Sequence, residues 1–212
     1  MRHDPPEVTE RNVANMALVG GRPVVDFVNT LSDRALAQPL ERLATYGDLL
    51  HWCVREEIFG SAERTRLERL AASHPRKAAD ALSRVRGLRE LLFQMFSATT
   101  DGHVPASEAL DEFTTLLAEA AKYRRLEPAD GGLRWHWSRG DDELDWMLWP
   151  LAWSASELLG SEDLGRLKEC AQDDCRWIFL DLSKNRSRRW CTMEECGNRA
   201  KARRHYEKSR KS

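Results

Sequence analysis

The chain has 212 residues, with 33 Lys and Arg against 34 Asp and Glu, so its formal net charge is −1. Hydrophobic residues make up 42% of the chain, which is enough to bury a core and excludes a wholly disordered protein. No apolar run approaches the roughly 20 residues that a transmembrane helix needs. The first ten residues, MRHDPPEVTE, also lack the apolar stretch of a secretory signal. We therefore expect a cytoplasmic protein with no membrane partner.

Charge and cysteine are distributed unevenly along the chain. The segment from Cys170 to Ser212 contains 12 basic and six acidic residues, a net charge of +6. The preceding 169 residues contain 21 basic and 28 acidic residues, a net charge of −7. Four of the five cysteines lie in the basic segment. This asymmetry predicts two modules with different roles, which we place at residues 1–165 and 166–212.

The first apolar elements of the chain follow turn and capping signals. Residues 24–30, VVDFVNT, come after a glycine-rich turn; their β-branched content favours a short strand, and a helical turn is equally possible at this length. Thr45 followed by Asp48 predicts a capped helix that begins after Thr45. Cys53 falls on the apolar stripe of that helix, so we expect a small buried side chain rather than a reactive thiol.

Three further helices are predicted from apolar residues at helical spacing. One includes residues 67–70 and stops near Pro75. A long one covers residues 82–96 and ends before Asp101 and Gly102, and the third covers residues 110–120. The front part of the chain is therefore expected to be a helical bundle.

A change of pattern after residue 131 predicts a β-hairpin. Apolar and polar residues alternate over residues 133–138, a polar turn follows at 139–142, and residues 144–149 form the expected second strand. Pro150 then suits the first turn of a helix that ends at Gly160. The predicted fold class is mainly α with small β hairpins.

Five of the eight tryptophans lie between Trp135 and Trp153. Such a cluster could stack on a base or line a ligand pocket. The favoured interpretation is that a hairpin and a helix pack these aromatic rings into the core.

The four cysteines of the basic segment form the pattern C-x4-C-x15-C-x4-C. Two close pairs separated by a short insert can bind a metal ion tetrahedrally. A strand at 176–180, a turn at 183–187 and a return strand at 188–190 would bring the pairs together, and a helix would begin at Cys196 and Gly197. Two disulfides or four free thiols are the alternatives, and a cytoplasmic location disfavours disulfides. The expected ligands of one structural zinc ion are Cys170, Cys175, Cys191 and Cys196.

Residues around these cysteines resemble a known family. Trp190 and Cys191, followed by the run Cys196-Gly197-Asn198-Arg199 with Lys201 close behind, are similar to the CGNR zinc finger. Residues 175–181, with Ser183, Arg188 and Arg189, also resemble its pattern. Gly20 and Gly21, followed by residues 26–30, resemble the start of the ABATE domain, which normally precedes this finger. The resemblance implies a stress-induced transcriptional regulator of bacterial type with a zinc-dependent DNA-binding tail.

The charge of the tail supports a nucleic-acid partner independently of the resemblance. From Arg176 onward, 12 basic residues oppose four acidic ones. On a helix, Arg199, Arg203, Tyr206 and Arg210 share one face, and Lys201, Arg204 and Lys208 share a neighbouring one. A solvated tail, or one that docks on an acidic protein surface, is the alternative. The candidate DNA-binding residues are Arg186, Arg188, Arg189, Asn198, Arg199, Lys201, Arg203, Arg204 and Lys208.

The body of the protein offers weaker functional signals. Asp26, Asn29 and Asp33, near Arg34, could line a pocket for an unknown small-molecule effector, although polar residues at such positions are usually caps or turn residues. No Ser-His-Asp order, phosphate loop or second metal motif is present, so we do not expect an enzyme. We predict a transcriptional regulator that binds DNA through the finger, with the N-terminal domain sensing a signal or forming a homodimer. The alternative is a zinc-dependent module that docks on an acidic protein partner without binding nucleic acid.

Overall fold

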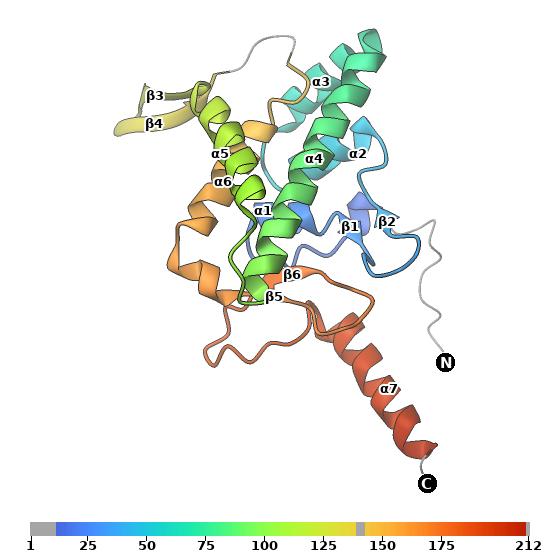
Figure 1. Cartoon of the computed structure of the whole chain (residues 1–212). Coiled ribbons are helices and arrows are strands. Elements are labelled where there is room, and N and C mark those ends of the chain that lie inside the picture. The colour runs from blue at the N-terminus through green and yellow to red at the C-terminus, as the bar shows by residue number, and fades with distance from the viewer. Residues whose placement is uncertain (1–11, 139–142, 211–212) are drawn as a thin grey trace.

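The computed structural model describes residues 12–138 and 143–210 of the chain. Figure 1 shows α4 running through a helical body, with α5 and α6 on one side and α2 and α3 on the other. α7 leaves the lower end of this body. The helices are α1 (Pro23–Val28), α2 (Tyr46–Arg55), α3 (Ser61–Ser73), α4 (Pro75–Thr100), α5 (Ser107–Ala121), α6 (Leu148–Leu159) and α7 (Asn198–Ser209).

The strands of the described residues pair into three small antiparallel hairpins, so the predicted fold class is confirmed. The pairs are β1 (Leu31–Ser32) with β2 (Leu40–Glu41), β3 (Arg124–Ala129) with β4 (Gly132–Trp137), and β5 (Leu167–Glu169) with β6 (Ile178–Leu180).

None of the helices in the described part of the chain is long and apolar enough to cross a membrane.

The predicted helices of the body are confirmed. The Thr45 hydroxyl accepts the Asp48 N–H at 3.1 Å, and the Asp48 carboxylate accepts the Thr45 N–H at 2.8 Å, which caps α2. Cys53 is fully buried on this helix, and burial raises the pKa of its thiol, so the side chain stays protonated. α3 ends and α4 begins around Pro75, and α4 stops before Asp101.

Of the two forms predicted for residues 24–30, the strand was wrong and the helical turn is confirmed, because Pro23–Val28 forms α1. Pro23 occupies the first helical position, and the Arg22 carbonyl accepts the N–H groups of Val25 and Asp26 at 2.9 and 3.1 Å. Every residue from Val24 to Val28 is buried, including Asp26, so these residues present no exposed face. Periodicity therefore could not distinguish a buried helix from a buried strand.

The hairpin around residues 133–138 forms with a different partner. β4 pairs with β3, placing Leu126 opposite Trp135, and the turn between them uses Gly131 and Gly132 with φ of 85° and 157°. Residues 144–149 instead make a turn and the start of α6, which ends before Gly160 as predicted. The sequence of β3, RRLEPA, lacks the alternation of apolar and polar residues by which strands are predicted, so this strand was missed. The predicted turn at 139–142 lies outside the described residues.

The tryptophan cluster packs mainly on the protein itself. Trp146 and Trp149 are buried, and the Trp149 ring stacks on Tyr123 with centroids 4.9 Å apart. Trp137 and Trp153 lie 4.8 and 4.5 Å from the Arg124 guanidinium. The packing interpretation therefore holds for Trp146 and Trp149 but was wrong for Trp135, which lies on the exposed hairpin with 54% of its surface accessible.

The strand expected at 176–180 forms in part, but its predicted partner was wrong. β6 pairs with β5, placing Leu180 opposite Leu167, whereas residues 188–190 form no strand. The buried Asp181 carboxylate organises the returning loop, since it accepts the N–H of Ser183 at 3.1 Å and that of Arg188 at 2.9 Å. Lys168 Nζ also lies 2.7 Å from this carboxylate. Hydrogen bonds and an ion pair of the Asp181 side chain therefore hold the returning loop, where the sequence predicted a second strand.

The β5–β6 hairpin is anchored to the helical body. The Asn29 amide donates to the Ile178 carbonyl and accepts the Ile178 N–H, each at 2.8 Å, so one side chain pairs with β6 as a neighbouring strand would. The Trp177 indole N–H also donates to Ser32 Oγ at 3.1 Å. Ile178 and Leu180 belong to the main hydrophobic core. The domain boundary at residues 165 and 166 stays a prediction.

Replacing Asn29 with Ala should destabilise the whole chain by about 3 kcal/mol, because a buried N–H and carbonyl of Ile178 lose their partners. Urea unfolding measures this change. Asn198→Ala is the matched control, since its amide makes an exposed bond to the Glu194 carbonyl. Equal effects from the two substitutions would contradict the anchoring role of Asn29.

Candidate metal centre

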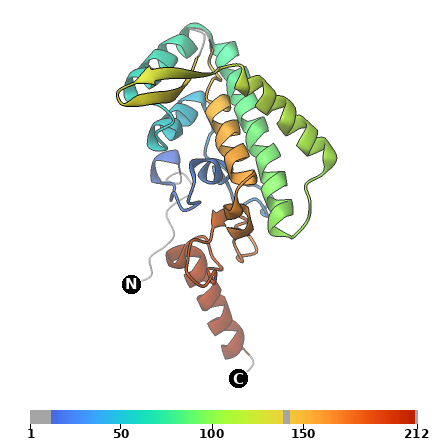
Figure 2. The same cartoon turned by 90° about the vertical axis from the view of Figure 1, so that its left-hand side faces the viewer.

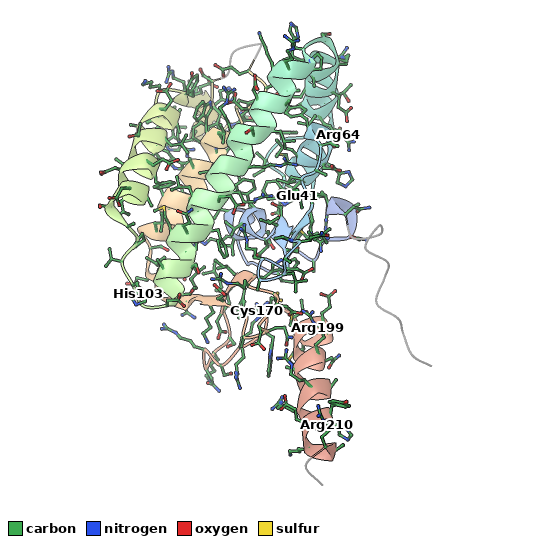
Figure 3. The ribbon with its side chains drawn as sticks, turned by 45° about the vertical axis from the view of Figure 1, so that its right-hand side comes forward. Glu41, Arg64, His103, Cys170, Arg199 and Arg210 are labelled. Carbon is green, nitrogen blue, oxygen red and sulfur yellow. The ribbon has the colours of Figure 1, made fainter. Side chains whose placement is uncertain are left out.

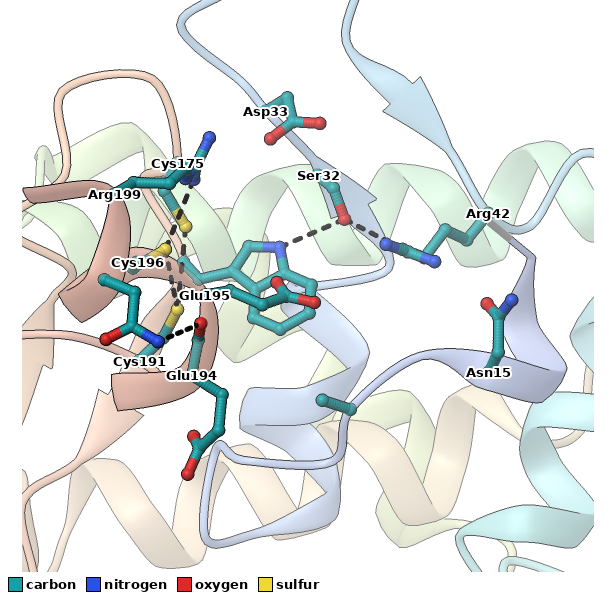
Figure 4. Close-up of a pocket in the computed structure, with 13 residues that line it drawn as sticks. Asn15, Ser32, Asp33, Arg42, Cys175, Cys191, Glu194, Glu195, Cys196 and Arg199 are labelled. Atoms are coloured by element: carbon teal, nitrogen blue, oxygen red, sulfur yellow. Dashed lines mark hydrogen bonds between the residues drawn. The ribbon is translucent and has the colours of Figure 1, made fainter. Parts of the chain in front are cut away.

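Four buried cysteine sulfurs meet at the lower end of the body. All four lie within 4.8 Å of one another, with Sγ–Sγ distances of 3.7 Å for Cys175 and Cys191 and 3.5 Å for Cys191 and Cys196. A tetrahedral zinc ion with Zn–S bonds of about 2.3 Å requires sulfurs about 3.8 Å apart. Figure 4 shows three of these cysteines beside Arg199. The spacing and the soft thiolate donors fit zinc.

Backbone hydrogen bonds hold the two cysteine pairs together. The Cys170 N–H donates to the Trp177 carbonyl at 2.8 Å, which closes the loop that carries the first pair. The Ala171 N–H donates to the Arg189 carbonyl at 2.8 Å and joins that loop to the returning chain. Cys196 lies in a π-helical turn, Met193–Gly197, capped by Thr192 and followed directly by α7. The helix expected after Cys196 and Gly197 therefore forms.

Polar donors and apolar packing surround the sulfurs. The Cys191 N–H donates to Cys170 Sγ at 3.4 Å, and Arg199 Nη2 lies 3.3 Å from Cys196 Sγ. Because four thiolates on Zn²⁺ leave a local charge of −2, the Arg199 guanidinium stabilises the loaded site. The cysteines also pack against Met16, Val19, Trp177 and Phe179. The body thus supplies part of the wall of the metal centre.

The disulfide alternative does not fit the structure. All five cysteines are free of disulfides, and the sulfur distances of 3.5 and 3.7 Å far exceed an S–S bond of about 2.05 Å. A family model described as "CGNR zinc finger" matches residues 166–209. The four cysteines are placed to bind one zinc ion. Since the protein supplies all four ligands, the ion is structural.

A second family model, described as "Putative stress-induced transcription regulator", matches residues 21–162, more than half of the chain. The chain belongs to the ABATE family. The predicted architecture, an ABATE region followed by a CGNR finger, is confirmed. No curated protein matches the chain at a significant level. Both families are regulatory or metal-binding rather than enzymatic.

Several of the predicted DNA-binding residues of the finger make contacts within the protein. Arg188 is half-buried, donates to the carbonyls of Trp190 at 3.1 Å and Val19 at 3.3 Å, and lies 4.2 Å from the centre of the Phe179 ring. The Asn198 amide donates to the Glu194 carbonyl at 2.9 Å. Arg188 therefore links the finger to the ABATE region.

The other predicted residues lie on the surface. Arg199 and Arg203 on α7 pair with acidic residues of the first cysteine loop. Arg186 and Arg189 are exposed on the returning loop, and the exposed side chains of α7 on the neighbouring face are Lys201, Arg204 and Lys208. The DNA-binding role of all these residues stays a prediction.

Three predicted ligand residues of the ABATE region have partners within the protein. Asp26 Oδ1 accepts the N–H groups of Val19 and Gly20 at 2.8 and 2.9 Å. Arg34 donates to Glu90 at 2.6 Å and lies over the Phe93 ring. With Asn29 bonded to β6, all three hold the fold, and a ligand role for them stays a prediction.

A pocket of about 560 Å³ lies between the ABATE region and the finger, and it includes Asp33 but not Asp26, Asn29 or Arg34. Sequence reasoning missed the rest of its lining, because its walls come from segments far apart in the chain. Figure 4 shows Ser32, Asp33, Arg42 and Arg199 in these walls. Trp177 and Asn198 also line the pocket.

Two carboxyls of the ABATE region, the buried Asp26 and the half-buried Glu56, have pKa values raised toward neutral pH. Burial raises the pKa of Asp26 to about 6, although the N–H groups of Gly20 and Val19 and the charges of Arg188 and Arg55 act to lower it. Burial and the neighbouring Asp26 raise the pKa of Glu56 to about 7. The folded chain therefore holds protons that the unfolded chain releases, so these groups make the protein less stable as pH rises from about 4 to about 7.

Asp26→Asn should reduce this pH dependence, because an amide oxygen can accept the same two N–H groups without carrying charge. The loss of stability between about pH 4 and about pH 7 should be smaller than in the wild type by about 2 kcal/mol. Urea unfolding across this pH range measures the difference. If stability depends on pH in the variant as it does in the wild type, Asp26 is not a source of this pH dependence.

The purified chain should contain one zinc ion, and Cys191→Ser should lose both the metal and stability. Cys53→Ser is the matched control, because Cys53 is equally buried but lies in the helical body. That variant should lose stability while keeping one zinc ion per chain. Metal analysis measures the zinc content, and thermal unfolding measures the stability. A wild-type zinc content near zero would contradict the assignment of the four cysteines as a zinc centre.

Proposed function

We propose that this protein is a transcriptional regulator that binds DNA through its zinc finger. The observation that carries the proposal is the position of α7, which projects from the body in both views of the ribbon (Figures 1 and 2). None of the residues of α7 is buried, and every residue from Lys201 to Arg210 is exposed. A helix normally buries an apolar stripe against its own protein, so the surface of α7 is available to a partner.

The charge of α7 favours a polyanion as that partner. The helix has five Lys and Arg residues and one acidic residue, Glu207. Figure 3 shows this helix with Arg199 at its attached end and Arg210 beyond its far end. A regular row of cations on an exposed helix matches the phosphates of a DNA groove. This array supports DNA more strongly than a single acidic protein site.

Within this array, we assign the leading phosphate contacts to Lys201 and Arg204. Among residues 12–138 and 143–210, no acidic side chain forms an ion pair with either of them. Lys208 follows on the same face of α7, and Arg186 and Arg189 lie on the exposed returning loop. Arg188 is not among these contacts, because its guanidinium donates to backbone carbonyls within the protein.

The ABATE region supplies the regulatory half of the proposal. We assign it to sensing a small-molecule signal or to forming a homodimer, as expected of a regulator whose finger carries the DNA contacts. The pocket between the region and the finger supports the first role, because residues of both parts line it. A regulator of this kind acts in the cytoplasm, where bacterial DNA lies.

The affinity of the full chain for a generic DNA duplex should fall steeply as salt rises. Replacing both Lys201 and Arg204 with Ala should weaken binding about tenfold at low salt and reduce the salt slope by about 1.8, because two phosphate contacts are lost. Fluorescence anisotropy over a salt series measures both values. The matched control replaces Arg76 and Lys77, two exposed basic residues at the start of α4, and should bind like the wild type.

Absence of binding at low salt, or equal weakening by the control, would contradict the proposed function. Pull-down with nuclease treatment separates it from the protein-docking alternative. A partner that stays bound after the nucleic acid is digested would favour docking on a protein.

A further inference from the structure

Two arginines of α7 are paired with adjacent carboxylates of the first cysteine loop. Arg199 Nη1 lies 3.0 Å from Asp174 Oδ2, and Arg203 Nη1 contacts Asp173 Oδ2. The arginines are four residues apart, so they lie on one face of the helix. The acidic residues lie between Cys170 and Cys175 and are held in place by the loop that carries the first two zinc ligands.

The two pairs differ in how strongly they are fixed. Arg199 also contacts Cys196 Sγ, and Asp174 Oδ1 is buried without a hydrogen-bond partner among the described residues. This inner pair is therefore part of the metal centre. The outer pair is more open to solvent on its acidic side, since 79% of the Asp173 side chain is exposed against 33% of Asp174, whereas the two arginines are almost equally exposed. An ion pair this exposed exchanges easily with other charged groups.

A carboxylate and a phosphate offer an arginine the same kind of acceptor. Arg203 can donate to only one of them through the same N–H groups, so Asp173 occupies the position that a DNA phosphate would take. The negative charge of Asp173 also repels a phosphate approaching this turn of α7. Asp173 therefore opposes DNA binding through both contact and charge.

We propose that Asp173 is an intramolecular competitor for DNA phosphate at Arg203. Binding of DNA through the outer turn of α7 requires the pair between Arg203 and Asp173 to open. The competition lowers affinity for duplex DNA of any sequence, because it acts on a phosphate contact rather than on a base contact. This inference rests on the proposed DNA-binding function.

Asp173→Asn tests the competition in the full zinc-loaded chain. The variant should bind a generic duplex about two- to fivefold more tightly than the wild type at low salt, because Arg203 is released. Adding Arg203→Ala to Asp173→Asn should abolish the gain. In the wild-type background, Arg203→Ala alone should weaken binding, because it leaves the negative charge of Asp173 unpaired beside the DNA.

Glu194→Gln is the matched control, because it removes one exposed negative charge of the finger without breaking the pair. Fluorescence anisotropy measures all five proteins, and zinc content with circular dichroism verifies their folding. Equal affinity of the wild type and Asp173→Asn would overturn the competition and leave the DNA-binding function intact. A gain that survives Arg203→Ala, or is matched by Glu194→Gln, would show a general charge effect and overturn it as well. If no protein binds DNA, the proposed function fails together with the inference.

Discussion

The gathering of four buried cysteine sulfurs within 4.8 Å is the constraint on which the lower half of this structure depends. Such a cluster is stable as thiolates only around a divalent cation, because four unscreened negative charges at this spacing repel one another strongly. Around it, the chain arranges two cysteine loops, a capped π-helical turn and the first turn of α7. The exposed helix owes its starting point and direction to the metal centre.

The metal centre is joined to the ABATE region by specific polar contacts. Asn29 pairs with the backbone of Ile178, and Arg188 reaches from the finger to the Val19 carbonyl. Val19 is itself held by the buried Asp26 carboxylate through its N–H. These bonds form a continuous connection from the core of the ABATE region to the loop beside the cysteines, so α7 has a defined position relative to the body.

Local signals in the sequence predicted the parts of the fold that local interactions determine. The Thr45 cap, the break at Pro75 and the cysteine spacing each correspond to an observed feature. Long-range packing decided the rest. Residues 24–28 form a helix whose residues are all buried, and the polar strand β3 lacks the apolar alternation by which strands are predicted. The pairing of Arg203 with Asp173, 30 residues earlier, leaves no local signature, so the sequence predicted two basic faces on α7 where the structure neutralises part of one of them.

The central claim is that the zinc centre organises a basic helix for binding DNA. The most direct test compares the affinity of the full chain for duplex DNA in its zinc-loaded form, after removal of the metal by a chelator, and after zinc is restored. We predict that removal abolishes the binding and that restored zinc recovers it. Binding of equal strength by the metal-free chain, or no binding by the zinc-loaded chain, would contradict the claim.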